Sequence, residues 1–218
     1  MSDQSSALPL PGQEDLWFLP LGGSGEIGMN MNLLGHAGDW IMVDCGVTFD
    51  EVVDPDSHRT ASVVSADPKF ISRQKENLRG IVITHAHEDH LGALPFLWPR
   101  LKAPVYASPF AAEVLRRKLA QHGLDGRVPI HVINQRERFT LGNFTLEFLP
   151  ITHSIPEAQS LLIETAVGTV LHTADWKIDY DPVIGEPFDE ALYKGLSKLN
   201  IRALLCDSTN ALKPGMSK

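Results

Sequence analysis

The sequence predicts an α/β fold (in the α+β arrangement) in which stacked β-sheets are flanked by helices. Apolar runs of strand length dominate the first half and the middle of the chain, and helical patterns are inserted between them. The 218 residues, of which 43% are hydrophobic, are enough for the core of one sizeable domain or of two small ones. No internal repeat or low-complexity tract points to a repeat architecture.

The N-terminal third is predicted to consist of strands and loops. Residues 1–15 are polar with scattered Pro and Gly, lack the apolar core of a signal peptide, and are predicted to be a flexible lead-in. Residues 46–68 are acidic and rich in Pro, Ser and Asp, which predicts a long irregular loop. Between these segments we expect strands at 16–21, 31–34 and 40–43, a Gly-rich loop at 22–28 and a turn at 35–38.

The clearest helix is predicted at residues 109–122. Ser108 suits its N-cap and Pro109 its first turn, and Gly123 suits its C-terminal cap. Another helix should follow the short apolar strand at 80–83, because apolar residues recur at helical spacing at 91, 94, 97 and 98. The buried stripe of the helix at 109–122 should be Ala111, Val114, Leu115 and Leu119. The remaining elements are expected as strands at 128–133, 138–140, 144–149, 160–163 and 169–172, a helix near 190–196 and a strand at 203–206.

Charge and cysteine content exclude several classes of protein. Nineteen basic and 27 acidic residues give a net charge of −8, which argues against broad, nonspecific binding of nucleic acid while leaving a local basic groove possible. Two cysteines, Cys45 and Cys206, do not make a disulfide framework, so a reduced, cytoplasmic protein is the default expectation. No apolar run approaches 18 residues, so no transmembrane helix is expected.

The densest group of chemically competent residues follows the strand at 80–83. Three histidines and two carboxylates fall within the six residues from His85 to His90. Side chains two positions apart in an extended segment can point the same way, so His85 and His87 can bind one metal ion. Asp89 and His90 lie one turn further on and can reach a second ion. Imidazole and carboxylate ligands suit zinc, and also manganese or iron, whereas a merely solvated turn would not need such a density of ligands.

The other ligands must come from the ends of other strands. His153 follows the strand at 144–149, Asp175 follows the strand at 169–172, and Asp44 ends the strand at 40–43. Asp175 is the candidate bridging carboxylate between two ions, where a bridged water would lose a proton near neutral pH and become the nucleophile. Asp44 is expected to orient the histidine cluster from behind the ligands. Taken singly, an aspartate after a strand is more often a turn former or helix cap.

The remaining histidines and the glycine-rich segment give weaker indications of function. The remaining histidines have no supporting context and are expected to be ordinary surface or half-buried residues, namely His36, His58, His122 and His131. The sequence does not decide the position of His172, because the alternation of its strand can direct the side chain to the core or to the site. Residues 23–28 match the dinucleotide-binding pattern G-x-G-x-x-G, but the following residues indicate a strand and not the helix that such a site needs. We expect these glycines to form a tight turn close to the metal site.

The segment from Thr84 to His90 resembles the H-x-H-x-D-H signature of the metallo-β-lactamase superfamily, and Asp44, His153 and Asp175 fall in the order of its other motifs. The resemblance implies a metallo-β-lactamase fold, a four-layer αβ/βα sandwich with metals at one edge between the sheets. Four blocks are narrower and look like those of bacterial ribonuclease J, in the β-CASP branch: GGSGEIGMN at 22–30, HSIPE at 153–157, ADWKID at 174–179 and DSTN at 207–210. The resemblance covers roughly residues 16–215.

This resemblance implies a site for two divalent metal ions, with zinc expected first and manganese as the alternative. His85, His87 and His153 hold one ion, Asp89 and His90 hold the other, and Asp175 bridges them. Asp89, His90 and Asp175 are the catalytic group, and Asp44 and Asp207 support it, Asp207 matching the acidic residue that opens the β-CASP motifs. The implied reaction is hydrolysis of RNA phosphodiester bonds, exo- or endonucleolytic, by a metal-bridged hydroxide.

The chain departs from the family pattern at its end, because it stops where the β-CASP domain is inserted and holds no counterpart of a late metal-binding histidine. We therefore expect a fragment of a longer nuclease, in which residues 16–210 are the N-terminal portion of the lactamase-like domain and residues 211–218 begin a linker to a missing β-CASP domain. RNA is the expected partner, membranes are not, and a homo-oligomer would form through regions absent here. The alternatives are a small-molecule hydrolase such as a thioesterase of the same superfamily, or an inactive truncated domain.

Overall fold

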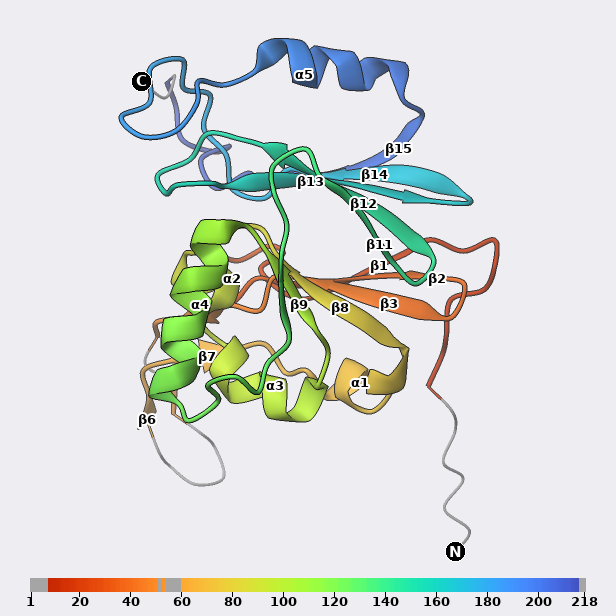
Figure 1. The fold of residues 1–218 in the computed structure, drawn as a ribbon, viewed down its shortest axis with the longest axis vertical. Coiled ribbons are helices and arrows are strands. Elements are labelled where there is room, and N and C mark those ends of the chain that lie inside the picture. Colours follow the sequence, from red (N-terminus) through yellow and green to blue (C-terminus); the bar gives the residue numbers. More distant parts are fainter. Residues whose placement is uncertain (1–7, 51, 54–59, 216–218) are drawn as a thin grey trace, which may run out of the picture.

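Two stacked β-sheets, each covered by helices on its outer face, form a four-layer sandwich in the computed structural model (Figure 1). The structure describes residues 8–50, 52–53 and 60–215. Residues 1–7 of the predicted lead-in, 51 and 54–59 of the predicted long loop, and 216–218 of the predicted linker lie outside the described residues. The predicted fold class is confirmed, and β2 and β3 are buried at every position, as strands of a sheet covered on both faces are.

The first sheet has the strand order β1-β2-β3-β8-β9-β10. Its first three strands form an antiparallel meander, and β3, β8, β9 and β10 run parallel to one another. The strands span Trp17–Gly22 (β1), Met31–His36 (β2), Asp39–Val43 (β3), Leu78–Ile83 (β8), Val105–Ala107 (β9) and Ile130–Val132 (β10). The parallel β3 and β8 therefore end at the same edge of the sheet.

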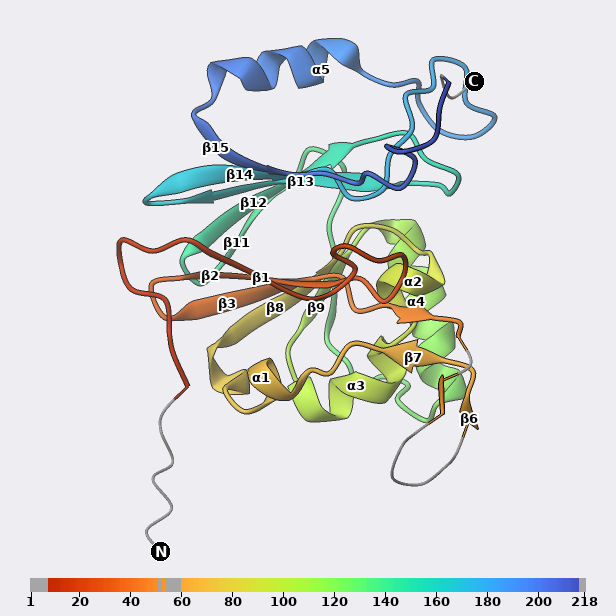
Figure 2. The same cartoon turned by 180° about the vertical axis from the view of Figure 1, so that it is seen from behind.

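The second sheet has the order β11-β12-β13-β14-β15, antiparallel except for the parallel pair β14 and β15. Its strands span Arg138–Leu141 (β11), Phe144–Pro150 (β12), Gln159–Thr165 (β13), Gly168–His172 (β14) and Ile201–Leu205 (β15). The ends of β12 and β14 lie at the same edge as the ends of β3 and β8. Figure 2 shows the loop after β1 and the end of β15 at this edge, on the side of α2 and α4.

Helices cover the outer faces of both sheets (Figure 1). Those on the first sheet span Lys69–Ser72 (α1), Glu88–Leu91 (α2), Leu94–Leu101 (α3) and Pro109–Gln121 (α4), and α5 (Glu190–Gly195) covers the second; single 3₁₀ turns span Lys75–Asn77 and Leu196–Lys198. The predicted cap of α4 is confirmed, since the Ser108 hydroxyl accepts a hydrogen bond from the Ala111 N–H. The buried stripe contains Ala112, while Val114 is only partly buried.

Three hydrophobic clusters separate the four layers. The largest lies between the first sheet and its helices, the second between the two sheets, and the smallest between the second sheet and α5. Neighbouring residues of β2 divide between them, because Leu33 packs in the first cluster and Leu34 in the second. The same alternation directs the side chains of Asn32 and His36 toward the space between the sheets.

The structure differs from the sequence prediction in several segments. The helix expected after the histidines is two helices, because the Asp89 carbonyl accepts from the Asn30 N–H and the Ala93 N–H donates to the Cys45 carbonyl. The loop at 46–68 contains two short antiparallel ladders, Val47–Thr48 (β4) with Val64–Ser65 (β7) and Val52–Val53 (β5) with Thr60–Ala61 (β6). Strand β9 and helix α1 were not predicted, since three or four residues carry too little periodicity.

Candidate metal centre

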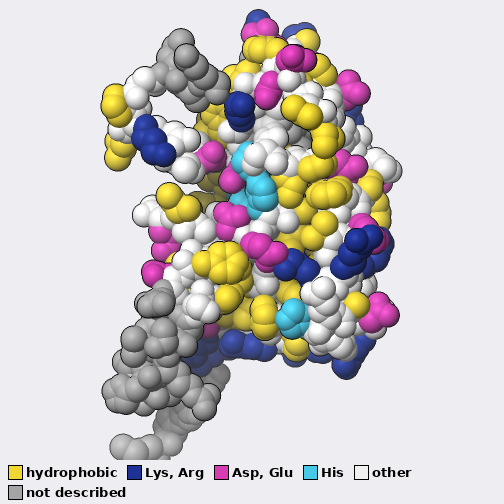
Figure 3. Space-filling model, turned by 90° about the vertical axis from the view of Figure 1, so that its left-hand side faces the viewer, with side chains coloured by type: hydrophobic (Ala, Val, Ile, Leu, Met, Phe, Trp, Pro, Cys, Tyr) yellow, Lys and Arg dark blue, Asp and Glu magenta, His cyan; other side chains and the backbone are white. Residues whose placement is uncertain are grey.

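The histidine segment lies at the edge where β8 ends. Strand β8 stops at Ile83, the chain is extended at His87, and α2 begins at Glu88. This geometry turns the segment across the gap between the sheets. Figure 3 shows histidine side chains beside acidic ones in a hollow of this face.

Three histidines from two distant segments converge there. Nε2 of His85 lies 3.0 Å from Nδ1 of His87, and Nε2 of His153 lies 3.3 Å from the same His87 atom. Ligand nitrogens at 2.0–2.1 Å from a tetrahedral zinc ion lie about 3.3 Å apart. The three imidazoles therefore fit the nitrogen side of a zinc site, as one candidate ligand group.

A second candidate group consists of His85, His90 and Asp175. Oδ1 of Asp175 lies 3.4 Å from Nε2 of His90, and Oδ2 of Asp175 lies 3.7 Å from Nε2 of His153. The two oxygens of one carboxylate thus face the two halves of the cluster. Asp89 reaches the same place from α2, with Oδ2 3.5 Å from Nε2 of His90. Two candidate ligand groups therefore meet at this edge, with the Asp175 carboxylate between them.

Asp44 lies behind the ligands, 1% exposed, at the end of β3. Oδ2 of Asp44 lies 2.7 Å from Nδ1 of His90, and Oδ1 accepts from the Thr84 N–H at 2.9 Å. The Thr84 hydroxyl lies 2.9 Å from Oδ2 of Asp44 and 3.0 Å from Nδ1 of His85. With Nδ1 of both histidines engaged by this one carboxylate, directly or through Thr84, their Nε2 atoms are left for a ligand.

Protonation differs between the histidines. Burial, followed by repulsion from His90, lowers the pKa of His85, and burial also lowers the pKa of His153. Burial disfavours charge on His90 as well, but the carboxylates of Asp44, Asp175 and Asp89 outweigh it and raise its pKa well above the usual value. For Asp175 burial opposes ionisation, but the hydrogen bond and charge of His90 lower its pKa.

Sequence reasoning missed two positions that build this site. The N–H and the side-chain amide of Asn30 both donate to the Asp89 carbonyl, at 3.0 and 3.1 Å, and Nδ2 of Asn30 lies 3.1 Å from Nε2 of His90. At Gly46 an added Cβ would lie 1.6 Å from the Asp89 carbonyl oxygen, so only glycine lets β4 pass the helix. Neither residue lies in the histidine segment at 85–90, and neither is a metal-ligand type, so the search for ligands did not select them.

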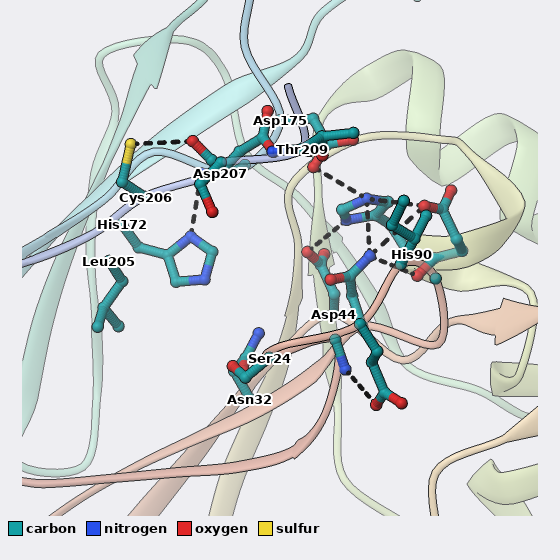
Figure 4. A pocket seen from close by; sticks show the side chains of 18 of the residues that line it. Ser24, Asn32, Asp44, His90, His172, Asp175, Leu205, Cys206, Asp207 and Thr209 are labelled. Carbon is teal, nitrogen blue, oxygen red and sulfur yellow. Dashed lines mark hydrogen bonds and ion pairs between the residues drawn. The ribbon is translucent and has the colours of Figure 1, made fainter. Parts of the chain in front are cut away.

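The Gly-rich loop lines a cavity beside the cluster. The loop runs directly into β2, which excludes the helix N-terminus of a dinucleotide site, and Gly23, Gly25 and Gly28 have the positive φ of the tight turn that was expected. The cavity holds about 580 Å³ and is also lined by Asp44, Asp89, His90 and Asp175 (Figure 4). The predicted proximity of these glycines to the histidine cluster is therefore observed.

The other residues considered in the sequence analysis lie in different surroundings. Asp207 and His172 line the cavity but are not among the two ligand groups. His36 corrects the prediction, because it is 2% exposed and its Nδ1 lies 2.7 Å from the Asp15 carbonyl oxygen; its apolar strand neighbours bury it. His122 and His131 are exposed, and His58 lies outside the described residues. Both cysteines are free thiols.

A family model described as beta-lactamase superfamily domain matches residues 39–197, which hold most of both sheets and every candidate ligand. The chain belongs to this superfamily. Solved structures agree on the metallo-β-lactamase fold: Rm3 metallo-beta-lactamase superposes with a TM-score of 0.54 at 19% identity, over 90% of this chain and 76% of its own. A protein of unknown function from Enterococcus faecalis V583 has a TM-score of 0.65 at 17% identity, over 94% of this chain and 52% of its own.

Curated relatives confirm the narrower resemblance to bacterial ribonuclease J. Ribonuclease J of Sinorhizobium meliloti is 48% identical over 208 residues, which are 94% of this chain and 36% of the relative. Ribonuclease J of Helicobacter pylori (strain ATCC 700392 / 26695) is 36% identical over 197 residues, 90% of this chain and 28% of the relative. The chain thus spans about a third of the length of these relatives. In the part of the chain that the structure describes, no helix is long and apolar enough to cross a bilayer.

Proposed function

We propose that this chain carries the metal centre of a ribonuclease of the ribonuclease J type, a metal-dependent hydrolase of RNA phosphodiester bonds. The observation that carries the proposal is the position of Asp175, whose two carboxylate oxygens face His90 and His153. Such a carboxylate suits a pair of ions acting on one phosphoryl group. The similarity to two proteins named Ribonuclease J over at least 90% of the chain favours RNA as the substrate.

In this proposal His85, His87 and His153 hold one divalent ion, Asp89 and His90 hold the other, and Asp175 bridges them. Zinc is proposed because three imidazole ligands suit it, with manganese as the alternative on the carboxylate side. When bound, the ions neutralise the phosphoryl oxygens and acidify water. The lowered pKa of His85 and of His153 keeps both imidazoles neutral near pH 7, which is the form that can act as a ligand.

The chain's own residues would hold this arrangement in place. Asp44 holds Nδ1 of His90, and Thr84 stands between Asp44 and His85, so both rings keep a fixed orientation. Asn30 holds the first turn of α2 through the Asp89 carbonyl. The cavity of about 580 Å³ beside Asp89, His90 and Asp175 gives a substrate access to the cluster.

The wider assignments rest on the same similarity. We propose that residues 16–210 form the lactamase-like domain and that residues from 211 onward begin a connection to a further domain. We propose RNA as the partner, a cytoplasmic location and a homo-oligomer formed through regions beyond those described. Asp207 would support the site from the edge of the cavity, where its Oδ1 accepts from the Thr209 N–H at 2.9 Å.

The test measures metal content and RNA cleavage together. Full-length gene product and the 218-residue chain are purified without added metal, and bound zinc and manganese are counted by elemental analysis. A 5′-labelled single-stranded RNA and a thioester are then offered to the wild type, to His87→Ala and to His122→Ala, an exposed histidine remote from the cluster. The proposal expects metal and RNA cleavage in the full-length protein, lost in His87→Ala and kept in His122→Ala. Metal binding with thioester hydrolysis and no RNA cleavage would contradict it.

A further inference from the structure

His153 differs from His85 and His90 in what holds its ring. Nδ1 of His85 lies 3.0 Å from the Thr84 hydroxyl, and Nδ1 of His90 lies 2.7 Å from Oδ2 of Asp44. Among the described residues, Nδ1 of His153 has no such partner, and its Nε2 faces the other ligands. A histidine that binds a metal through one ring nitrogen usually has the other nitrogen held by a hydrogen bond. The orientation of the His153 ring therefore depends on the loop that carries it.

The loop that carries His153, residues 151–158, connects β12 to β13. It is closed at its base, because the Ile151 N–H donates to the Ala158 carbonyl at 3.1 Å. The first N–H of β13 then donates to the Thr84 carbonyl at 3.0 Å, directly before the histidine segment. These two bonds fix the ends of the loop beside the other ligands.

Glu157 connects the same loop to helix α4. Its Oε2 accepts a hydrogen bond from the Phe110 N–H at 2.7 Å. This is the first N–H that α4 can offer, because Pro109 has none, and the next one, of Ala111, donates to the Ser108 hydroxyl. A carboxylate in this place is also favoured by the positive end of the helix dipole.

The backbone of Glu157 indicates that its side chain has a role. Its φ is 56°, in the left-handed region that glycine adopts freely and that costs energy for a residue with a Cβ. A residue other than glycine persists in such a conformation only where its surroundings hold it there. The contact with α4 provides this hold, and a glycine at the same turn could not make it.

Helix α4 is fixed in turn to the segment that carries His85 and His87. Nζ of Lys118 lies 2.6 Å from Oε1 of Glu88, which follows His87 and begins α2. The two helices lie side by side (Figure 1). Helix α4 therefore contacts both segments that supply the three imidazoles, one through Lys118 and the other through Glu157.

We propose that Glu157 is a positioning residue, which holds the His153 loop against α4 and so directs the His153 imidazole toward His85 and His87. The proposal rests on the metal centre of the proposed function. It gives Glu157 no contact with an ion or with the substrate, because its carboxylate is bound to the end of α4.

The test is calorimetric titration of zinc into the metal-free, full-length protein, and its readout is the binding event that His153→Ala abolishes. Glu157→Ala removes the acceptor, so this event should weaken about tenfold while any other event is unchanged. Glu157→Gln keeps an oxygen that can accept from the Phe110 N–H but loses the charge, so the loss should be smaller, about threefold.

Ser108→Ala is the matched control, because it removes the other side-chain hydrogen bond at the same end of α4 and leaves the His153 loop untouched. Its zinc affinity should equal that of the wild type. Nitrogen chemical shifts of His153 in the metal-free protein give a second readout. They should change in Glu157→Ala and stay at their wild-type values in Ser108→Ala, whereas a role confined to the stability of α4 would affect both variants alike.

An unchanged zinc affinity in Glu157→Ala, or an equal loss in Glu157→Ala and Ser108→Ala, would overturn the positioning role. If circular dichroism shows that Glu157→Ala has lost its fold, Glu157→Asp decides, because it keeps the charge but is one methylene too short and should also weaken the event. RNA cleavage by the wild type is measured on the same samples. A wild type that binds zinc without cleaving RNA overturns the proposed function, while the titrations still decide the role of Glu157.

Discussion

The two halves of the candidate metal centre differ in their ligands and in what supports them. The histidine half consists of His85, His87 and His153, and burial lowers the pKa of His85 and of His153. The carboxylate half, Asp89, His90 and Asp175, is backed by the buried Asp44 carboxylate and opens onto the cavity. From this difference we propose that the histidine half would retain an ion and that the carboxylate half would meet the substrate.

Asp175 joins the halves, so its replacement should have the largest effect. Asp175→Asn keeps the shape of the side chain but removes the charge that faces both His90 and His153. We expect RNA cleavage to fall about 10³-fold or more, because several kcal/mol of transition-state stabilisation depend on correctly held ions. Elemental analysis should find less than the wild-type metal content. A variant with wild-type metal content and wild-type RNA cleavage would show that Asp175 is not part of the metal centre.

Asp44 supports the carboxylate half through its contact with Nδ1 of His90. Asp44→Asn should weaken metal binding and cleavage by about 10- to 100-fold, the usual cost of losing a partner that orients a ligand. Calorimetric titration of metal into the metal-free protein measures the change. The histidine half should be affected less, since Asp44 reaches His85 only through Thr84. An equal loss of metal affinity at both halves would contradict the proposed difference between them.

Thr84 provides the complementary test on the histidine half. Thr84→Val removes the hydroxyl between Asp44 and Nδ1 of His85 without changing the shape of the side chain, and we expect about a tenfold loss of metal affinity. Thr84→Ser keeps the hydroxyl and serves as the control. Nitrogen chemical shifts of His85 should report a mixture of tautomers in the Val variant only. Unchanged shifts would mean that Thr84 does not hold the ring.

The pH dependence of the metal-free protein should separate the halves by sign. The pKa values of His85, His153 and His172 are lowered in the fold, so the unfolded chain binds more protons and stability falls as pH drops below about 6.5. The pKa of His90 is raised, so its contribution is complete below about 6.5 and is lost as pH rises above it. Each group changes the free energy of unfolding by at most about 1.4 kcal/mol per pH unit.

Denaturant unfolding of the metal-free protein across pH 5–9 checks this expectation, which is a maximum of stability near neutral pH. In Asp44→Asn one of the three carboxylates that raise the pKa of His90 is gone, so the loss of stability at alkaline pH should become smaller while the loss at acid pH remains. An alkaline loss of unchanged size would assign the effect to a group other than His90.

Local pattern was enough to predict most strands, helix α4 and the candidate ligands. Three of the histidines lie in one dense segment, and His153 and Asp175 each follow an apolar strand, so position and the family resemblance together made them candidates. The contributions of Asn30 and Thr84 could not be predicted, because they depend on which backbone carbonyl or carboxylate lies opposite after folding. The break between α2 and α3 has the same origin, a tertiary hydrogen bond from Ala93 to Cys45.

The most direct measurement of the central claim is calorimetric titration of the metal-free protein with zinc, for the wild type and for His153→Ala. We predict two binding events of unequal affinity in the wild type, with the tighter one on the histidine half. His153→Ala should abolish the tighter event and leave the weaker one in place. A single event in the wild type, or loss of the weaker event in His153→Ala, would contradict the division of the centre into two halves.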